Sequence, residues 1–266
     1  MFDSIAGDYD ALNHILSLDV DKIWRKKALK QIVDAPAPAR VLDLACGTGD
    51  FSIAIAKALS RSHKRVGTPI EAHVKAPAKA PVEAQVTSTG FVTGDSGRSD
   101  LMTKGHVTGV DLSEGMLAVM REKVQKSGLT EMISIEEGDG ENLRFPDNTF
   151  DRVTIAFGIR NFENREKGLR EMLRVLKPGG RLVILELSRP ENKIIRWFYD
   201  LYFLHILPKI GGKVSGDKAA YAYLPASVAA FPGKKEFSAT MRKAGFRAVT
   251  HKAFTLGICR MYTGEK

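Results

Sequence analysis

The chain has 266 residues, of which 44% are hydrophobic and 27% charged, and its formal net charge is +9. This composition is that of a globular protein with a sizeable core and excludes a disordered or fibrous chain. No apolar run reaches the roughly 20 residues that cross a bilayer, the start lacks a signal-peptide pattern, and Cys46 and Cys259 lack metal-ligand spacing, so we expect a cytoplasmic protein without disulfides or bound metal.

Residues 1–35 form the first predicted element, which is helical. Apolar side chains recur there at helical spacing, at Trp24, Ala28, Leu29, Ile32 and Val33. Because this segment precedes the regular alternation of strands and helices, we expect it to form a lid over the rest of the protein.

The most informative stretch runs from Val41 to Asp50 and reads Val-Leu-Asp-Leu-Ala-Cys-Gly-Thr-Gly-Asp. It predicts a buried strand, a glycine turn and a helix that begins at about Asp50. Gly47 and Gly49 carry no Cβ, so the turn can adopt strained angles and a ligand can approach its backbone closely. The first N–H groups of the helix point to the same place. The stretch therefore predicts a nucleotide pocket.

Two ligand classes compete for this pocket. A dinucleotide turn has a third glycine and seats a pyrophosphate at the helix start. Here that third position is Ser52, and the acid at Asp50 would repel a phosphate. A sulfonium nucleoside brings no phosphate, so the turn favours S-adenosylmethionine.

The segment from about 60 to 105 has a different composition. Stretches such as Ala76-Pro-Ala-Lys-Ala-Pro81 resemble a low-complexity linker, which buries too little apolar surface to offset its ordering entropy. We predict a flexible insertion within the domain.

Strands and helices alternate again from His106 onward. The predicted strands are 106–111, 133–137, 150–157 and 181–187, and the predicted helices are 115–126 and 163–176, the latter ended by Pro178-Gly179-Gly180. A last pair of strands, 248–254 and 256–263, predicts an antiparallel closing hairpin. The pattern indicates one domain over residues 1–266, a Rossmann-like, doubly wound and mostly parallel α/β sheet. Residues 190–232, with the aromatic run Ile194–Leu207, are predicted to form a lid on the substrate side.

Acidic residues lie at or just after the ends of the second and third predicted strands. Asp111 ends the second strand, where a carboxylate accepts hydrogen bonds from ribose hydroxyls or else caps the next helix. Asp139 and Gly140 follow the third strand, where they face an adenine edge or form an ordinary turn. Together with the glycine turn, these strand ends predict a site for an adenosine-containing cofactor.

Several motifs carry a family resemblance. Val41–Asp50, Val110–Leu117, Gly138–Asp151, Ala156–Asn161 and Leu176–Arg181 resemble the motifs of class I methyltransferases. More narrowly, the chain resembles the demethylmenaquinone and ubiquinone C-methyltransferase family of respiratory quinone biosynthesis. That narrower resemblance rests on Phe2-Asp-Ser-Ile-Ala-x-x-Tyr9-Asp10-x-x-Asn13, on Phe157-Gly-Ile-Arg-Asn161, and on Ser215-Gly-Asp217 followed by Tyr221-x-Tyr-Leu-Pro225.

The resemblance implies a cofactor and a reaction. The cofactor is S-adenosylmethionine, and the residues expected to bind it are Gly47, Thr48, Gly49, Asp111, Asp139, Gly140 and Ala156. Ala156 stands where many relatives place a serine. The implied reaction is C-methylation of a reduced polyprenyl quinone precursor, foremost demethylmenaquinol to menaquinol and also the benzoquinol of the ubiquinone pathway.

Chemistry on the quinol needs a phenolate, because a ring carbon is otherwise a weak nucleophile. Arg160 is the candidate for stabilising that anion and Asn161 for orienting the ring, while Tyr9, His14 and His205 are candidate proton acceptors. The polyprenyl tail needs an apolar path, which the run Ile194–Leu207 offers. Asp200 and His205 interrupt that run, so we expect it to lie on a membrane surface rather than cross the bilayer.

Two alternatives to quinol methylation follow from the same residues. One alternative is a methyltransferase that acts on another hydrophobic small molecule. The other is an S-adenosylmethionine-binding regulatory or nucleic-acid-binding protein without catalysis, which only the basic net charge supports. Basic runs such as Arg25-Lys26-Lys27 lack interleaved aromatic residues, so no nucleic-acid partner is expected. A homo-oligomer stays open.

Overall fold

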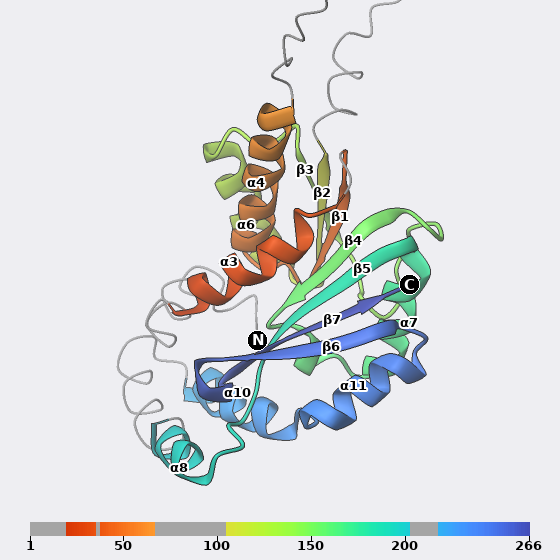
Figure 1. Cartoon of the computed structure of the whole chain (residues 1–266). Coiled ribbons are helices and arrows are strands. Elements are labelled where there is room, and N and C mark those ends of the chain that lie inside the picture. The colour runs from red at the N-terminus through yellow and green to blue at the C-terminus, as the bar shows by residue number, and fades with distance from the viewer. Residues whose placement is uncertain (1–19, 36–37, 67–104, 203–217) are drawn as a thin grey trace, which may run out of the picture.

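A single seven-stranded sheet organises the protein, with helices on both of its faces (Figure 1). The structure is a computed structural model that describes residues 20–35, 38–66, 105–202 and 218–266. The strands are β1 (Arg40–Leu44), β2 (His106–Asp111), β3 (Ile133–Glu137), β4 (Phe150–Ala156), β5 (Leu176–Leu187), β6 (Arg247–Phe254) and β7 (Cys259–Glu265). The helices are α3 (Val20–Ile32), α4 (Asp50–Val66), α6 (Glu114–Lys126), α7 (Arg165–Val175), α8 (Lys193–Leu201), α10 (Lys218–Ala230) and α11 (Lys234–Lys243), with short 3-10 turns η1 (Ile159–Asn161) and η3 (Thr255–Gly257).

The strand order is β3-β2-β1-β4-β5-β7-β6. Strands β1 to β5 pair in parallel, β7 runs antiparallel to β5, and β6 pairs antiparallel with β7. The order reverses between β1 and β4, and in open α/β sheets ligands bind beyond the carboxyl ends of the strands at such a reversal. The predicted doubly wound sheet and its closing hairpin are confirmed.

Both faces of the central strands are buried, and successive residues serve different cores. Val41 belongs to the core under α3, α4 and α6, whereas the next residue, Leu42, belongs to the core under α7 and α11. Helix α3 contributes Trp24, Ala28 and Ile32 to the first of these cores. The predicted helical face of the N-terminal segment is therefore confirmed over the residues that the structure describes.

The Pro-Gly-Gly segment is a correction to the sequence prediction. We expected residues 178–180 to separate α7 from a strand that begins at Arg181, but β5 begins at Leu176, directly after the helix. Phe150 pairs with Leu176 and Arg152 pairs with Arg181, with a register shift between them. The extra residues on β5 are thus accommodated as a bulge, where Gly179 has a φ of +74°.

The closing hairpin also differs in detail from its prediction. We expected its second strand from Leu256, but residues 255–257 form η3 and β7 begins at Cys259. Thr255 and Leu256 have φ values of 45° and 57°, which lie outside the extended region of backbone conformation.

Several predictions fall outside the described residues. These are the motif of residues 2–13, the candidate bases Tyr9, His14 and His205, most of the predicted insertion (67–104), and residues 215–217. Across the ranges that the structure does describe, no helix is both long and apolar enough to span a bilayer.

The turn after β1 lies very close to α6. Gly49 has a φ of +83°, and a Cβ added there would come within 2.4 Å of Met120 Cγ. A Cβ on Gly109 of β2 would come within 2.7 Å of Met120 Cε. The two glycines therefore allow α6 to pack onto the sheet beside the turn.

We predict that Gly49→Ala destabilises the protein by about 3 kcal/mol, since it adds both backbone strain and a clash with Met120. Gly128→Ala is the matched control, because Gly128 has a φ of +64° but nothing within 4 Å of an added Cβ. It should cost only about 1 kcal/mol, the strain alone. Denaturant unfolding of both variants checks this, and equal costs would contradict the proposed close packing.

Candidate functional site

Two adjoining cavities lie at the carboxyl edge of the sheet. We call them the apolar cavity, of about 400 Å³, and the polar cavity, of about 320 Å³. Their shared border is formed by Ala45, Gly47, Ala156 and Phe157. Ala45 and Phe157 have positive φ values, 48° and 65°, so the border is also a place of backbone strain.

Asp111 fastens the glycine turn to the end of β2. Its Oδ2 accepts a hydrogen bond of 2.8 Å from the N–H of Gly47, and its Oδ1 accepts one of 2.9 Å from the N–H of Ser113. Ser113 in turn caps α6 by accepting from the N–H of Met116. The carboxylate lines the polar cavity, so the two predicted residues Gly47 and Asp111 are brought together there.

Asp139 and Gly140 also line the polar cavity. Asp139 Oδ1 accepts a hydrogen bond of 2.8 Å from the N–H of Glu141, as expected of a turn acid. A Cβ on Gly140 would lie 2.6 Å from the ring of Phe162. Glycine at this position lets the ring of Phe162 pack closely against the turn.

Thr48, Gly49 and Asp50 occupy different surroundings. Thr48 is buried in the wall of the apolar cavity, where its Oγ1 accepts from Lys123 Nζ at 3.3 Å. Gly49 lines neither cavity and instead packs on Met120. Asp50 forms ion pairs with Lys123 and, at 3.7 Å, with Arg25, so the negative charge at the start of α4 is compensated.

Asp43 is a candidate site residue that the sequence analysis missed. It lies in β1, is 1% exposed and lines the apolar cavity, and its Oδ2 accepts a hydrogen bond of 2.6 Å from Ser52. Burial raises the pKa of Asp43 to about 7, although the bond from Ser52 and the charge of Arg25 act in the opposite direction. An acid within an apolar strand was the signal available. A buried carboxylate of this kind suits a cationic ligand group.

Ser52 stands at the position of the third glycine of a dinucleotide turn, and it contacts Asp43. Its hydroxyl is the hydrogen-bond donor to the buried carboxyl of Asp43. The same residue that argued against a dinucleotide therefore supports a carboxylate at the cavity wall.

Arg160 forms a buried ion pair beneath the apolar cavity. Its Nη1 lies 2.9 Å from Glu186 Oε1, its backbone N–H donates to Glu186 Oε2 at 3.1 Å, and its Nε donates to Ser227 at 3.3 Å. Nη1 also donates to the carbonyl of Phe157. Glu186 is fully buried. These contacts fix the guanidinium in the cavity wall and connect it to the strained border residue Phe157.

Asn161 follows Arg160 in η1 but faces the other cavity. It lines the polar cavity, and its Oδ1 accepts a hydrogen bond of 2.9 Å from the hydroxyl of Tyr223 on α10. The two predicted catalytic residues thus stand on opposite sides of the border.

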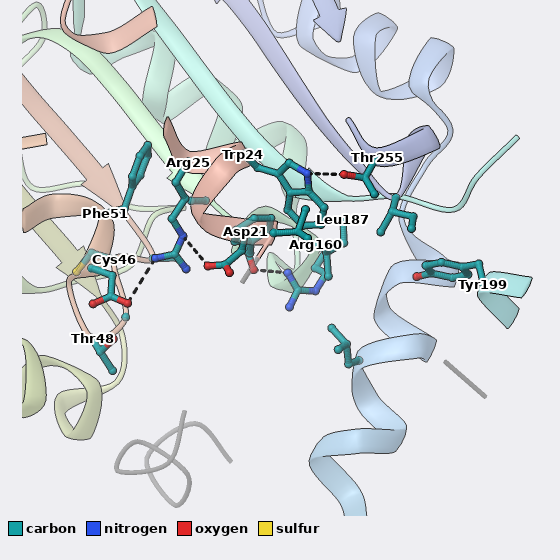
Figure 2. Close-up of a pocket in the computed structure, with 18 of the residues that line it drawn as sticks. Asp21, Trp24, Arg25, Cys46, Thr48, Phe51, Arg160, Leu187, Tyr199 and Thr255 are labelled. Carbon is teal, nitrogen blue, oxygen red and sulfur yellow. Dashed lines mark hydrogen bonds and ion pairs between the residues drawn. The ribbon is translucent and has the colours of Figure 1, made fainter. Parts of the chain in front are cut away.

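The segments predicted as lids supply the remaining walls of the apolar cavity. Helix α3 contributes Trp24, whose Nε1 donates to Thr255 at 2.9 Å (Figure 2). Helix α8 contributes Ile195, Phe198 and Tyr199. Burial raises the pKa of Tyr199 well above its usual value, so its hydroxyl stays protonated. Arg25 and Asp21, 3.6 Å apart, are charged residues of α3 on the same wall.

The described residues hold no cluster of three or more His, Cys, Asp or Glu side chains that suits a metal ion. The arrangement offers instead acceptor groups in one cavity, apolar and aromatic walls in the other, and a buried carboxyl and guanidinium near the border.

The whole chain matches a known family. A model of the ubiE/COQ5 methyltransferase family matches residues 1–266. The ubiquinone/menaquinone biosynthesis C-methyltransferase UbiE of Geobacter sulfurreducens is 44% identical over 266 residues, which are 100% of this chain and 87% of that protein. The demethylmenaquinone methyltransferase of Bacteroides fragilis (strain ATCC 25285) is 39% identical, over 100% of this chain and 91% of that protein.

Solved structures agree in fold. An S-adenosylmethionine-dependent methyltransferase from Aquifex aeolicus has a TM-score of 0.53 at 20% identity, covering 90% of this chain and 88% of its own. A possible histamine N-methyltransferase from Thermotoga maritima has a TM-score of 0.56 at 18% identity, covering 100% and 98%.

At identities of 18% and 20%, the solved structures support the fold alone. The family model and the relative at 44% identity cover every residue of the chain and therefore establish the family. The chain belongs to the ubiE/COQ5 methyltransferase family, and it is an S-adenosylmethionine-dependent methyltransferase.

Proposed function

We propose that this protein methylates a ring carbon of a reduced polyprenyl quinone precursor, foremost demethylmenaquinol. The observation that carries the proposal is the apolar cavity of about 400 Å³, which borders the polar cavity and is walled by aromatic residues of α3 and α8. Relatives at 39% and 44% identity, named for demethylmenaquinone and for ubiquinone/menaquinone methylation, support the choice of substrate.

The residues of the two cavities fit S-adenosylmethionine. We propose that Asp111 accepts the ribose hydroxyls, that Asp139 and Gly140 face the adenine, and that Asp43 pairs with the α-ammonium group. The raised pKa of Asp43 supports its part, because a buried carboxylate without a full counter-charge gains most from a cationic ligand. Gly47, Thr48 and Ala156 surround the same region, and Gly49 acts through packing. When bound, the cofactor supplies an electrophilic methyl group.

Arg160 acts on the quinol in this proposal. A phenolate oxygen next to the reacting carbon makes that carbon nucleophilic, and a fixed cation lowers the cost of forming it. Glu186 holds the guanidinium at the cavity wall, so Arg160 need not reorganise as the charge develops. Since arginine stays protonated in proteins, it stabilises the anion and does not take the proton. Asn161, held by Tyr223, orients the ring at the border.

The polyprenyl tail requires an apolar exit, and Phe198 of α8 both lines the apolar cavity and is largely exposed. We therefore propose that the protein meets its substrate at the cytoplasmic surface of a membrane. The test of the whole function is turnover with demethylmenaquinol and with the demethylated benzoquinol, followed by mass spectrometry. Absence of a methylated product from either quinol would contradict the proposal.

We predict that Asp111→Ala weakens S-adenosylmethionine binding by about 2–3 kcal/mol, because charge-assisted contacts to the ribose are lost. The variant should remain folded, although losing the bonds to Gly47 and Ser113 costs stability as well. Calorimetric titration measures the affinity and thermal unfolding the stability. A folded variant with unchanged affinity would remove Asp111 from the cofactor site.

The affinity for S-adenosylmethionine should rise with pH up to about 7, the pKa of Asp43 in the ligand-free protein. The cofactor's ammonium favours the ionised carboxyl, so below pH 7 binding must expel a proton and weakens by up to about tenfold per unit. Asp43→Asn should bind weakly with a flat profile between pH 5.5 and 7, by calorimetry. A profile unaltered by the substitution would assign the dependence to another group.

The same shift has a consequence for stability. Because the folded-state pKa of Asp43 is raised from 3.8 to about 7, the folded protein holds this proton more tightly than the unfolded chain. The contribution of Asp43 to stability is therefore full below pH 4 and is lost as the pH rises to about 7.

Arg160→Lys should lower kcat and kcat/KM together by about 100-fold, while cofactor affinity changes little. Lysine keeps the charge but lacks the planar fork that contacts Glu186 and Ser227 at once. Glu186→Gln is the comparison, since it loosens the guanidinium without removing it, and a smaller fall in kcat is expected. A normal kcat with only a raised KM in Arg160→Lys would reduce Arg160 to a substrate-binding residue.

A further inference from the structure

Exposed apolar side chains gather around the mouth of the apolar cavity. The structure exposes eight large hydrophobic side chains among the residues it describes. Six of them come from three elements that also line this cavity, and they are Ile23 of α3, Ile194, Trp197, Phe198 and Leu201 of α8, and Leu256 of η3. We call these six residues the apolar rim. The other two, Leu112 and Tyr223, belong to the polar cavity and to the contact with Asn161.

The three elements of the apolar rim are joined to one another by contacts. Trp24 of α3 donates to Thr255 of η3, and Lys27 Nζ lies 4.9 Å from the ring centroid of Phe254. Ser188, in the segment that leads to α8, donates to the carbonyl of Gly257 at 2.7 Å. In Figure 1, α3, α8 and the connection between β6 and β7 all lie on the left side of the molecule. The rim residues therefore belong to one surface.

Helix α8 is apolar on two faces. Ile195 and Tyr199 line the cavity, whereas Ile194 and Trp197 point outward and are 70% and 61% exposed. The polar residues Arg196 and Asp200 of α8 do not cover this outer face. Arg196 donates to the carbonyl of Pro190 at 2.9 Å, and Asp200 pairs with Arg189. A helix that is hydrophobic on both faces is normally buried on both.

Leu256 adds a second, independent observation. It is 72% exposed and has a φ of 57°, a conformation that leucine rarely adopts. An apolar side chain that is both strained and exposed at the tip of a hairpin gains nothing in water. A partner that buries it would account for both properties.

The charges beside the apolar rim are positive. Helix α3 exposes Lys26, Lys27 and Lys30, and its one acid, Asp21, is buried. Lys193 is exposed at the start of α8. The nearby acid Glu191 is paired with Arg260 and Lys234. Apolar side chains among lysines match the boundary between acyl chains and anionic headgroups.

We propose that the apolar rim is the surface by which this protein docks on an anionic lipid bilayer, with the mouth of the apolar cavity facing the lipid. This inference deepens the proposed function and rests on it in one respect, that the tail of the substrate leaves through that mouth. A docked rim lets the ring enter the cavity while the tail remains among acyl chains, so the tail need not cross water.

The docking surface is tested by co-sedimentation with vesicles of phosphatidylglycerol and phosphatidylethanolamine, without quinol or cofactor. The double variant Ile194→Ser/Trp197→Ser alters no residue that lines the cavity, and it should bind the vesicles about tenfold more weakly. Leu112→Ser removes an equally exposed side chain outside the rim and should bind as the wild type does. Equal binding by the double variant and the wild type would overturn the proposal.

Leu256→Asn provides a test that a folding defect cannot imitate. Asparagine tolerates positive φ better than leucine, so this variant should unfold at a higher temperature yet bind vesicles several-fold more weakly. A more stable variant with undiminished vesicle binding would exclude Leu256 from the surface.

The fluorescence of Trp197 separates lipid from other occupants. The spectrum of the wild type minus that of Trp197→Ser should report a tryptophan in water and shift to the blue when vesicles are added. Blue-shifted emission of Trp197 without lipid would mean that the chain itself covers the apolar rim. A wild-type dimer that the double variant no longer forms would mean that a second copy of the chain covers it. Either result overturns the proposal. The protein could bind vesicles as expected and yet methylate no quinol. That result would contradict the proposed function but would leave the docking surface in place.

Discussion

The site depends on how closely the turn after β1 approaches its neighbours. Met120 of α6 fits against both Gly49 and Gly109, where any side chain would collide with it. The N–H of Gly47 meanwhile reaches the carboxylate of Asp111. The absence of Cβ atoms at the turn and on β2 thus fixes α6, the end of β2 and the glycine turn in one arrangement, and the polar cavity is what this arrangement encloses.

Two buried carboxylates of the site, one of a glutamate and one of an aspartate, have different surroundings. Glu186 is fully buried and forms an ion pair with Arg160, which anchors the guanidinium in the cavity wall. Asp43 is equally buried, but a hydroxyl is its near partner and its pKa is raised to about 7. The first carboxylate is structurally satisfied, whereas the second gains from a ligand of opposite charge. Burial alone would not have distinguished the two.

The sequence predicted the fold well because the signals were local. The alternation of strands and helices and the acid at the end of a strand are properties of short segments, and β1, β2 and Asp111 at the end of β2 lie where expected. The bulge at Pro178-Gly179-Gly180 was missed because only pairing with β4 turns a helix stop into part of a strand. Asp43 was missed because its meaning depends on a cavity that α3 and α8 close. The partition of Arg160 and Asn161 between two cavities likewise depends on how η1 meets β5 and α10.

The border between the cavities also bears on the thermal robustness of the chain. Ala45 and Phe157 hold left-handed backbone conformations there, at a cost of about 1–2 kcal/mol each, and the carbonyl of Phe157 receives the guanidinium of Arg160. Substitutions that relaxed this backbone would make the protein more stable while moving the border of the two cavities and the guanidinium bound to it. If the border serves the reaction, stabilising substitutions that leave activity intact are therefore to be sought elsewhere in the sheet and helices.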